Sequence, residues 1–272
     1  MQRTGGAAAA GGSGPRTTIE WAAMRYLFPD HSLSTADLAS GKVLFSRPGL
    51  TAFPVRLGNE LFLRGAALLE AAGRRPPYHV YDPTCGGGYL MTVLCLLNPH
   101  LIARLSISDI SSDALSIASK NVHLLSPEGM LRRQVELAAL AAASERESHV
   151  AAAASASRLH DWLDQQRAPV TQTDIFLADA TDPNEIRAHF SDNRSVDIGF
   201  ADTPYDLHST WQTDETGSAV PEMKILSAFA ELSVPVVILA TRKGLKLTNP
   251  GYRRHARLKN GHRALWIFEL VG

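Results

Sequence analysis

Cysteines and long apolar runs are both scarce in this sequence. Its 272 residues include two cysteines, Cys85 and Cys95, which are too few for the disulfide framework of a small secreted domain. No stretch reaches the roughly 18 consecutive apolar residues of a membrane-spanning helix. The Gly/Ala-rich residues 1–17 lack the aliphatic segment of a signal peptide, so we expect a flexible tail there. These absences predict a cytoplasmic protein with reduced thiols.

Net charge and several common catalytic signatures are also absent. The 27 basic residues balance the 27 acidic ones. The ten histidines are scattered, without close Cys/His pairs at ligand spacing, so we expect no metal site. Neither a nucleophile elbow nor a phosphate loop ending in Gly-Lys-Ser/Thr occurs. Basic residues are nevertheless concentrated, because the segment from Arg242 to Arg263 has eight Lys or Arg and no acidic residue. This segment predicts one basic face.

The hydrophobic pattern indicates an α/β fold. The 45% of hydrophobic residues suits a globular chain with a full core. Residues 18–76 predict a helical extension, with a short amphipathic helix over 18–27 and a longer helix that ends near Ala72. Short apolar runs then alternate with helical stretches, which predicts a parallel sheet wrapped by helices. The expected strands are His79–Tyr81, Ala103–Ser108, Ile175–Ala178, Val196–Ala201 and Pro235–Thr241.

The end of the chain and a long insertion refine this architecture. Two β-rich runs, Arg253–Leu258 and Ala264–Leu270, flank Asn260-Gly261, which is a strong hairpin signal. A parallel, Rossmann-like sheet that ends in an antiparallel hairpin is typical of class I methyltransferases, so we expect such a domain over residues 77–272. Residues 131–168 are rich in helix-forming residues and predict one or two inserted helices. The insertion is either a solvated addition without chemistry or part of an RNA-binding surface.

A glycine-rich segment follows the first expected strand and opens a helix, with the sequence Asp82-Pro83-Thr84-Cys85-Gly86-Gly87-Gly88-Tyr89-Leu90. Glycines let a backbone turn sharply and approach a ligand closely. The N–H groups at a helix start favour a carboxylate, such as that of a methionine moiety. The alternative is a merely flexible loop. We assign a role in binding a nucleotide-type cofactor to Asp82, Thr84, Cys85, Gly86, Gly88 and Tyr89.

Two further strand ends carry carboxylates suited to such a cofactor. Asp109, beside Ile110, ends the second expected strand, where a carboxylate can accept both ribose hydroxyls of a nucleoside. Its alternative role is to cap the next helix. Asp179 and Ala180 close the third strand, where an aspartate can accept a hydrogen bond from an adenine amino group. We assign all four residues to cofactor binding.

The segment Asp202-Thr203-Pro204-Tyr205 follows the fourth expected strand, at the edge where parallel sheets bind ligands. It has the form of the Asp-Pro-Pro-Tyr motif of amino-group methyltransferases, with Thr203 in place of the first proline. The Asp202 carboxylate and the Thr203 carbonyl are suited to accept the two hydrogens of an exocyclic amine and so to localise its lone pair. Pro204 fixes the direction of that carbonyl, and Tyr205 offers a ring for a flipped base. We therefore expect these four residues to be catalytic; the alternative is a structural turn.

Together these segments resemble the avilamycin-resistance 23S rRNA guanine methyltransferase family, of the AviRa type. The resemblance runs from about residue 36 to the end and includes Ala52–Leu57, Asp82–Leu90, Ser108-Asp109, Ala118–Asn121, Leu124–Gly129 and Asp202–Tyr205. It implies S-adenosylmethionine (SAM) as cofactor, 23S rRNA or the large ribosomal subunit as partner, methylation of a guanine, and resistance to an orthosomycin antibiotic. Thr84, Gly87 and Thr203 depart from the residues that the family tends to have there.

The basic segment supports an RNA partner. Lysines and arginines contact phosphates and supply affinity without choosing a sequence. We assign RNA binding to Arg47, Arg56, Arg242, Lys243, Arg253, Arg254 and Arg257, with a solvated charged face as the alternative. Three other functions stay open: a methyltransferase acting on DNA or a protein glutamine, a catalytically silent RNA-binding protein, and an NAD-dependent dehydrogenase. We expect a monomer.

Overall fold

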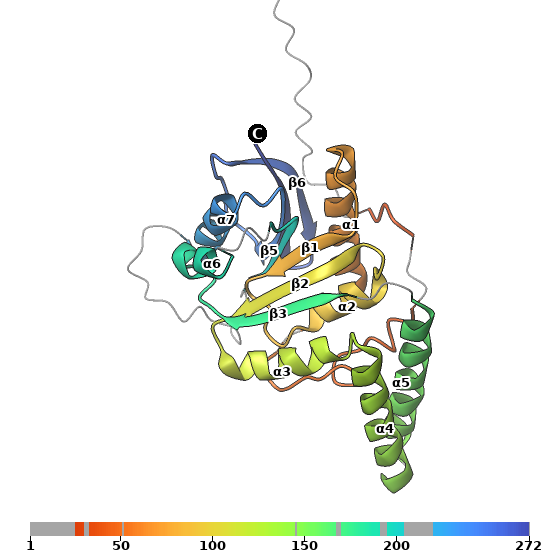
Figure 1. Ribbon diagram of the computed structural model, residues 1–272. Helices are drawn as coiled ribbons and strands as arrows, with labels where there is room; N and C mark the ends of the chain where they lie inside the picture. The colour runs from red at the N-terminus through yellow and green to blue at the C-terminus, as the bar shows by residue number, and fades with distance from the viewer. Residues whose placement is uncertain are drawn as a thin grey trace, which may run out of the picture.

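The computed structural model describes residues 25–29, 33–50, 52–144, 146–166, 170–190, 195–203 and 220–271. At its centre is a seven-stranded sheet in the order β3-β2-β1-β4-β5-β7-β6 (Figure 1). Five strands are parallel: β1 (Tyr78–Asp82), β2 (Ile102–Asp109), β3 (Gln172–Leu177), β4 (Ile198–Asp202) and β5 (Val236–Arg242). β6 (Tyr252–Asn260) and β7 (Arg263–Leu270) form an antiparallel hairpin beside β5. The predicted mixed sheet of a class I methyltransferase fold is confirmed.

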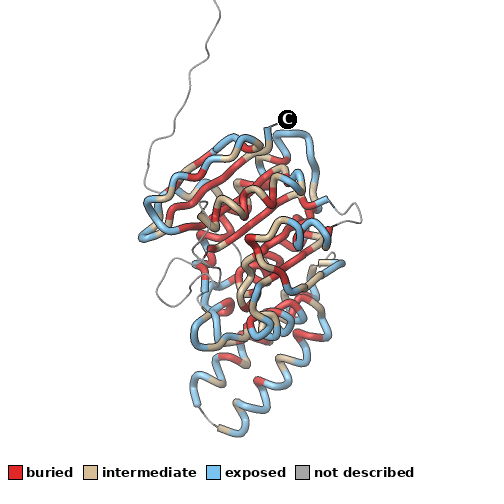
Figure 2. Tube along the Cα trace, turned by 90° about the vertical axis from the view of Figure 1, so that its left-hand side faces the viewer, coloured by how far each residue is buried: buried red, intermediate tan, exposed pale blue. Residues whose placement is uncertain are grey.

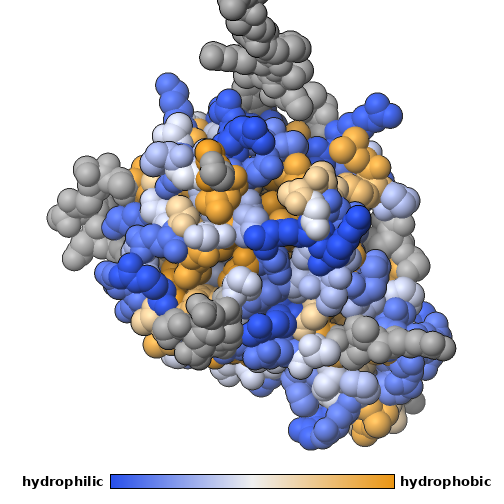
Figure 3. All heavy atoms as spheres, turned by 45° about the horizontal axis from the view of Figure 1, so that its top comes forward, coloured by the Kyte–Doolittle hydropathy of each residue, from blue (hydrophilic) through white to orange (hydrophobic). Residues whose placement is uncertain are grey.

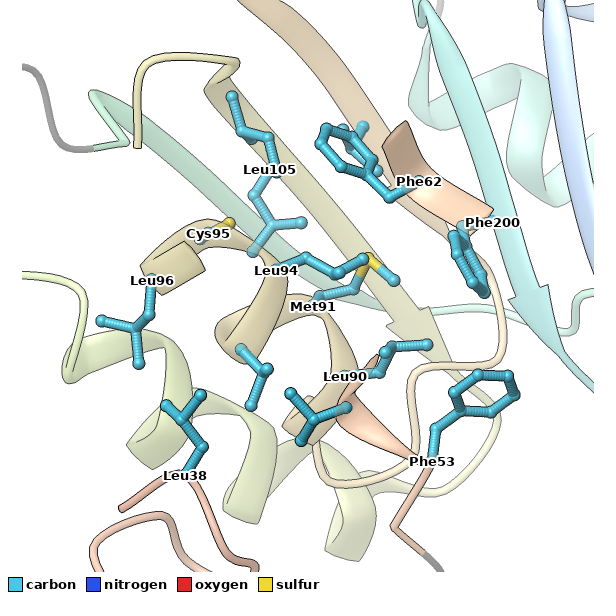
Figure 4. Packing of buried hydrophobic residues seen from close by; sticks show 14 of the residues in the cluster. Leu38, Phe53, Phe62, Leu90, Met91, Leu94, Cys95, Leu96, Leu105 and Phe200 are labelled. Carbon is cyan, nitrogen blue, oxygen red and sulfur yellow. The ribbon is translucent and has the colours of Figure 1, made fainter. Parts of the chain in front are cut away.

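Helices cover both faces of this sheet. α1 (Val55–Ala71), α2 (Tyr89–Leu97) and α3 (Ser112–His123) pack on one face, and α6 (Pro183–His189) and α7 (Pro221–Glu231) pack on the other. The central strands are buried from both sides, as Figure 2 shows in red, so most of their residues are apolar and do not alternate with exposed polar ones. Figure 4 shows the first face, where Leu90 and Met91 of α2 lie near Phe53 and Phe200.

The topology brings the functional segments to one edge of the sheet. β1, β2, β4 and β5 run in the same direction, so their carboxyl ends meet there. The glycine loop, residues 83–88, leaves this edge from β1, and the segment containing Thr203 leaves it from β4. Ligands of open α/β sheets bind at such an edge.

The predicted insertion consists of two helices, α4 (Pro127–Ser144) and α5 (Glu147–Gln165), which project from the body (Figure 1). α4 starts four residues before the expected boundary because the Ser126 hydroxyl accepts the N–H of Gly129 at 3.0 Å and caps the helix. A Cβ atom at Gly129 would collide with the carbonyl oxygen of His123, so this tight turn between α3 and α4 requires glycine. Apolar side chains, including Leu140 and Val150, are exposed on the hairpin, and Figure 3 shows orange atoms among blue ones at its far end.

The N-terminal helix predicted over residues 18–27 is not formed in the part that the structure describes; the expected tail, 1–17, and residues 18–24 lie outside the described residues. Residues 25–27 are not helical because their backbone bonds to α1 instead of to itself. The Glu60 carboxylate accepts the N–H of Leu27 at 2.8 Å and that of Phe28 at 3.2 Å, and Arg64 pairs with Glu60 at 2.7 Å. The longer helix is confirmed as α1.

Candidate active site

The glycine loop joins β1 to α2 in a tight conformation. Gly86 and Gly88 have φ angles of 52° and 68°, in the left-handed region that favours glycine. A Cβ atom at Gly88 would lie 3.1 Å from both Cα and Cβ of Ala118, so the loop packs directly on α3. α2 begins at Tyr89, and the N–H groups of its first turn have no partners within the helix. These features suit a loop that receives a carboxylate.

Asp82, at the end of β1, is 2% exposed. Its Oδ1 accepts the N–H of Thr84 at 2.9 Å, and the Thr84 hydroxyl lies 3.3 Å from the same oxygen and 3.4 Å from the carbonyl oxygen of Asp202. Burial raises the pKa of Asp82 to about 8, and the negative charges of Asp202 and Asp109 add to the effect. The carboxylates of Asp109 and Asp202, on the strands at either side of β1, therefore lie close enough to act on Asp82.

Asp109 ends β2 and contacts the glycine loop directly. Its Oδ2 accepts the N–H of Gly86 at 2.9 Å, and its Oδ1 accepts the N–H of Ser111 at 2.9 Å. The cap of α3 is Ser111, whose hydroxyl accepts the N–H of Ala114 at 3.2 Å, so the capping role considered for Asp109 is wrong. Each carboxylate oxygen can accept a further hydrogen bond. The position remains suitable for ribose hydroxyls.

Asp202 is the last residue of β4 and pairs with Ala240 of β5. Thr203 follows it and is buried, with its N–H donating to the Ala240 carbonyl at 2.9 Å and its hydroxyl donating to the same oxygen at 3.1 Å. These bonds fix the backbone at the start of the predicted catalytic segment. Pro204 and Tyr205 lie outside the described residues.

A pocket of about 580 Å³ lies beside this edge, between the ends of β2 and β3 and α6. Ile110 and Asp179 line it, as the sequence suggested, and Ile110 is 43% exposed despite being apolar. Ala180 is buried and does not line it. Its lining is mixed, with Ile110, Phe176 and Leu177 beside polar side chains such as Asp179, and this combination suits a heteroaromatic ring.

Other predicted cofactor residues shape the loop instead of lining the pocket. The Tyr89 hydroxyl donates to the carbonyl oxygen of Leu38 at 2.8 Å, which directs this side chain toward the N-terminal segment. The backbone N–H of Cys85 donates to the Ser108 carbonyl at 3.0 Å, and burial raises the pKa of the Cys85 thiol. The Cys85 bond therefore holds the loop against β2, and the Tyr89 bond joins the start of α2 to the N-terminal segment.

Two residues near the site were not predicted from the sequence. His189 lines the pocket, with its ring centroid 3.5 Å from that of Phe176 and its Nε2 2.6 Å from an Asp174 oxygen. Glu222, in the first turn of α7, is buried, and burial raises its pKa while Arg242 and Thr203 oppose the shift. Neither residue could be identified from a single sequence, because His189 belongs to no motif and Glu222 only follows a proline at the start of a helix.

The basic residues fall into separate groups. Arg242 and Lys243 are exposed at the carboxyl end of β5, close to the edge that carries Asp202. Arg253 and Arg254 are exposed near the start of β6, and Arg253 pairs with Glu269, which lies opposite Val236 at the other end of β5.

The remaining predicted arginines contact neighbouring side chains. Arg257 lies 4.3 Å over the ring of Trp266, Arg56 lies 4.3 Å over the ring of Tyr26, and Arg47 pairs with Asp113 at 3.2 Å.

Within the described ranges, no group of three or more His, Cys, Asp or Glu side chains is arranged to hold a metal ion. Among the same residues, no helix combines the length and apolar character needed to span a membrane.

Comparison with known proteins agrees with this geometry. The family described as rRNA methyltransferase AviRa matches residues 24–263. A curated relative from Streptomyces viridochromogenes, 23S rRNA (guanine(2535)-N(1))-methyltransferase, is 33% identical over 232 residues, which cover 85% of this chain and 90% of the relative.

Solved structures give the same result. Two structures of rRNA methyltransferase aviRa from Streptomyces viridochromogenes, at 2.4 Å and 1.5 Å, superpose with a TM-score of 0.77 at 31% identity. Each comparison covers 90% of this chain and 96% of the other. The sheet order, the site at its carboxyl edge and these matches lead to one conclusion: the chain belongs to the AviRa family of rRNA methyltransferases.

Proposed function

We propose that this enzyme methylates a guanine of 23S rRNA at the ring nitrogen N1, with SAM as methyl donor. The observation that carries the proposal is the cluster of Asp82, Asp109 and Asp202 around the glycine loop, in a chain of the AviRa family. The relative from Streptomyces viridochromogenes is named for guanine N1, a ring nitrogen, so the comparison does not support the exocyclic amine that we expected from Asp202-Thr203-Pro204-Tyr205.

The residues present fit a SAM molecule. The glycine loop is closely packed at the start of α2, where an added Cβ at Gly87 would lie only 2.9 Å from Leu50. N–H groups there suit the methionine carboxylate, Asp109 suits the ribose hydroxyls, and the pocket lined by Ile110 and Asp179 suits the adenine. Bound SAM would supply an electrophilic methyl group on a sulfonium. The protein's task is then to align the nucleophile and exclude water.

Methylation at N1 requires a group that accepts the proton of N1. In neutral guanine N1 carries a proton, and that proton must leave as the N–CH₃ bond forms. The Asp202 carboxylate, at the end of β4 and anchored beside β5, is positioned at the edge to accept it. The Thr203 carbonyl follows on the same backbone and suits the neighbouring amino group of guanine. Asp202 therefore acts as proton acceptor and Thr203 as the group that orients the base.

The RNA backbone is proposed to lie along Arg242 and Lys243, which border the carboxyl edge of the sheet. Arg253 and Arg254 lie toward the other end of β5 and add long-range attraction. We further propose that the enzyme acts as a monomer and that the modification confers resistance to an orthosomycin antibiotic. Growth of cells with and without the gene on avilamycin tests the last point.

The decisive experiment incubates the purified protein with 23S rRNA and labelled SAM and then identifies the methylated nucleoside by mass spectrometry. We expect N1-methylguanosine, which also stops reverse transcriptase because N1 lies on the pairing edge of the base. N2-methylguanosine would instead support the exocyclic amine. Label found only in DNA or in protein would overturn the rRNA substrate.

Two matched substitutions test the proton acceptor. Asp202→Asn keeps the size of the side chain but removes the carboxylate, so we expect turnover to fall at least 100-fold while SAM still binds. Asp197→Asn is the control, because Asp197 lies just before the same strand at its other end and bonds to Arg74 and the N–H of His79. Full turnover by the Asp202 variant would contradict the mechanism.

A further inference from the structure

The segment of residues 33–50, which we call the strap, is held against four helices. The Tyr89 hydroxyl of α2 donates to Leu38, and Arg133 of α4 donates to the Val43 carbonyl at 3.0 Å. Asp37, which is 4% exposed, accepts two bonds from Arg158 of α5, at 2.8 and 2.6 Å. The strap therefore has no regular structure of its own but a fixed path across α2, α3, α4 and α5.

The strap ends at the glycine loop. Cβ atoms built at Gly87 and Gly86 would lie 2.9 Å and 3.7 Å from the methyl groups of Leu50. The end of the strap thus forms one wall beside the loop that we assign to the methyl donor. Any shift of this wall changes the space above the loop.

Asn121, on α3, links the strap to the loop. It is fully buried and uses both ends of its amide. Its Oδ1 accepts the N–H of Phe45 at 2.7 Å, while its Nδ2 donates to the Phe45 carbonyl at 3.0 Å and to the Gly87 carbonyl at 2.7 Å. One side chain thereby fixes a peptide of the strap and a peptide of the glycine loop relative to each other.

We infer that Asn121 is a positioning residue for the methyl-donor site, and that the strap is one wall of that site. The inference rests on the proposed function. Removing the amide leaves the buried Gly87 carbonyl and the half-buried N–H and carbonyl groups of Phe45 without these bonds, which favours a different path for both segments. The loop would then present its N–H groups to the donor in a poorer arrangement, so affinity for SAM falls while affinity for RNA stays the same.

Two substitutions at Asn121 separate hydrogen bonding from packing. Asn121→Ala removes all three bonds. Asn121→Asp has nearly the same shape and keeps the acceptor for the Phe45 N–H, but it turns an acceptor toward the two carbonyls. We expect both variants to raise the dissociation constant for SAM at least tenfold, and the aspartate variant not to rescue the alanine variant.

The matched control is Asn98, another buried asparagine that donates to Asn59 at 2.7 Å and to the Leu94 carbonyl at 3.0 Å, at the end of α2 away from the loop. Asn98→Ala and Asn98→Asp are expected to lower the melting temperature comparably but to change the SAM dissociation constant less than twofold. Leu50→Ala provides a third test with little effect on stability, and we expect it to weaken SAM binding about threefold or more.

The measurements are calorimetric titration with SAM, thermal unfolding, and the separate KM values for SAM and 23S rRNA. A rise in the dissociation constant and KM for SAM alone, in the Asn121 and Leu50 variants, supports the inference. SAM affinities of these variants within twofold of the Asn98 variants would overturn it. SAM binding by the unaltered protein is measured first and separately. Failure of that protein to bind SAM would refute the proposed function instead of the inference about Asn121.

Discussion

Asp82 gives the sharpest prediction about stability, because its carboxyl is buried among other carboxylates. Substitution by asparagine keeps an Oδ1 that can accept the N–H of Thr84 and removes only the ability to ionise. Burial raises the pKa of Asp82 from 3.8 to about 8 in the folded protein. Between these values the folded state holds a proton that the unfolded state has released, so the stability of the natural protein falls as the pH rises.

The size of this fall follows from the pKa. Stability decreases by about 1.4 kcal/mol for each pH unit between the two pKa values and levels off above the folded one. From pH 6 to pH 8 the natural protein should therefore lose about 2 kcal/mol more than Asp82→Asn. The other ionisable groups are identical in the two proteins, so their contributions cancel in the difference.

The assay is urea unfolding of both proteins at pH 6, 7 and 8. Asp37→Asn is the control, because the pKa of Asp37 is shifted in the opposite direction from that of Asp82. Hydrogen bonding to Arg158 lowers the pKa of Asp37 to about 2 despite its burial, so Asp37 is ionised in both states over this range. Its variant should be less stable by about 2 kcal/mol at every pH tested. If the difference in unfolding free energy between Asp82→Asn and the natural protein stays constant from pH 6 to pH 8, the conclusion that buried Asp82 retains its proton is wrong.

Three further outcomes follow from the structure. Gly129→Ala should lower the stability by about 3 kcal/mol or more, seen in thermal unfolding, because its methyl group meets a backbone carbonyl that cannot move away cheaply. Asp109→Ala should raise the KM for SAM at least tenfold with a smaller change in the KM for RNA. Joint alanine substitution of Arg242 and Lys243 should reduce the salt dependence of log K for RNA binding by about two units of slope, whereas Arg253→Ala, which removes an ion-paired residue, should change it by less than one.

Most of the fold was readable from the sequence. Short apolar runs separated by helical stretches, with Asn260-Gly261 near the end, are sufficient to predict a parallel sheet with a terminal hairpin. Of the short helix expected over 18–27, the structure describes only residues 25–27, which are not helical because Glu60 accepts the backbone N–H groups of Leu27 and Phe28. A buried glutamate 32 or 33 residues further along the chain cannot be recognised from local pattern.

The candidate site was readable only where chemistry coincides with a strand end. Asp82, Asp109 and Asp202 follow apolar runs, so their meeting at one edge could be predicted from topology alone. Asn121 lies within a helix, and a single sequence gives no sign that its amide faces inward. The segment Asp202-Thr203-Pro204-Tyr205 also could not distinguish a ring nitrogen from an exocyclic amine as the methylated atom, because a carboxylate and a carbonyl suit either group.

The strap has a consequence for the order in which the protein is made. Phe45 bonds a residue 76 positions later in the chain, Val43 one 90 positions later and Asp37 one 121 positions later. During synthesis the strap leaves the ribosome long before α3, α4 and α5 exist, so it must wait unpaired for its partners. Contacts of such long sequence separation form slowly. One wall of the proposed cofactor site is therefore translated well before the three helices that fix it in place.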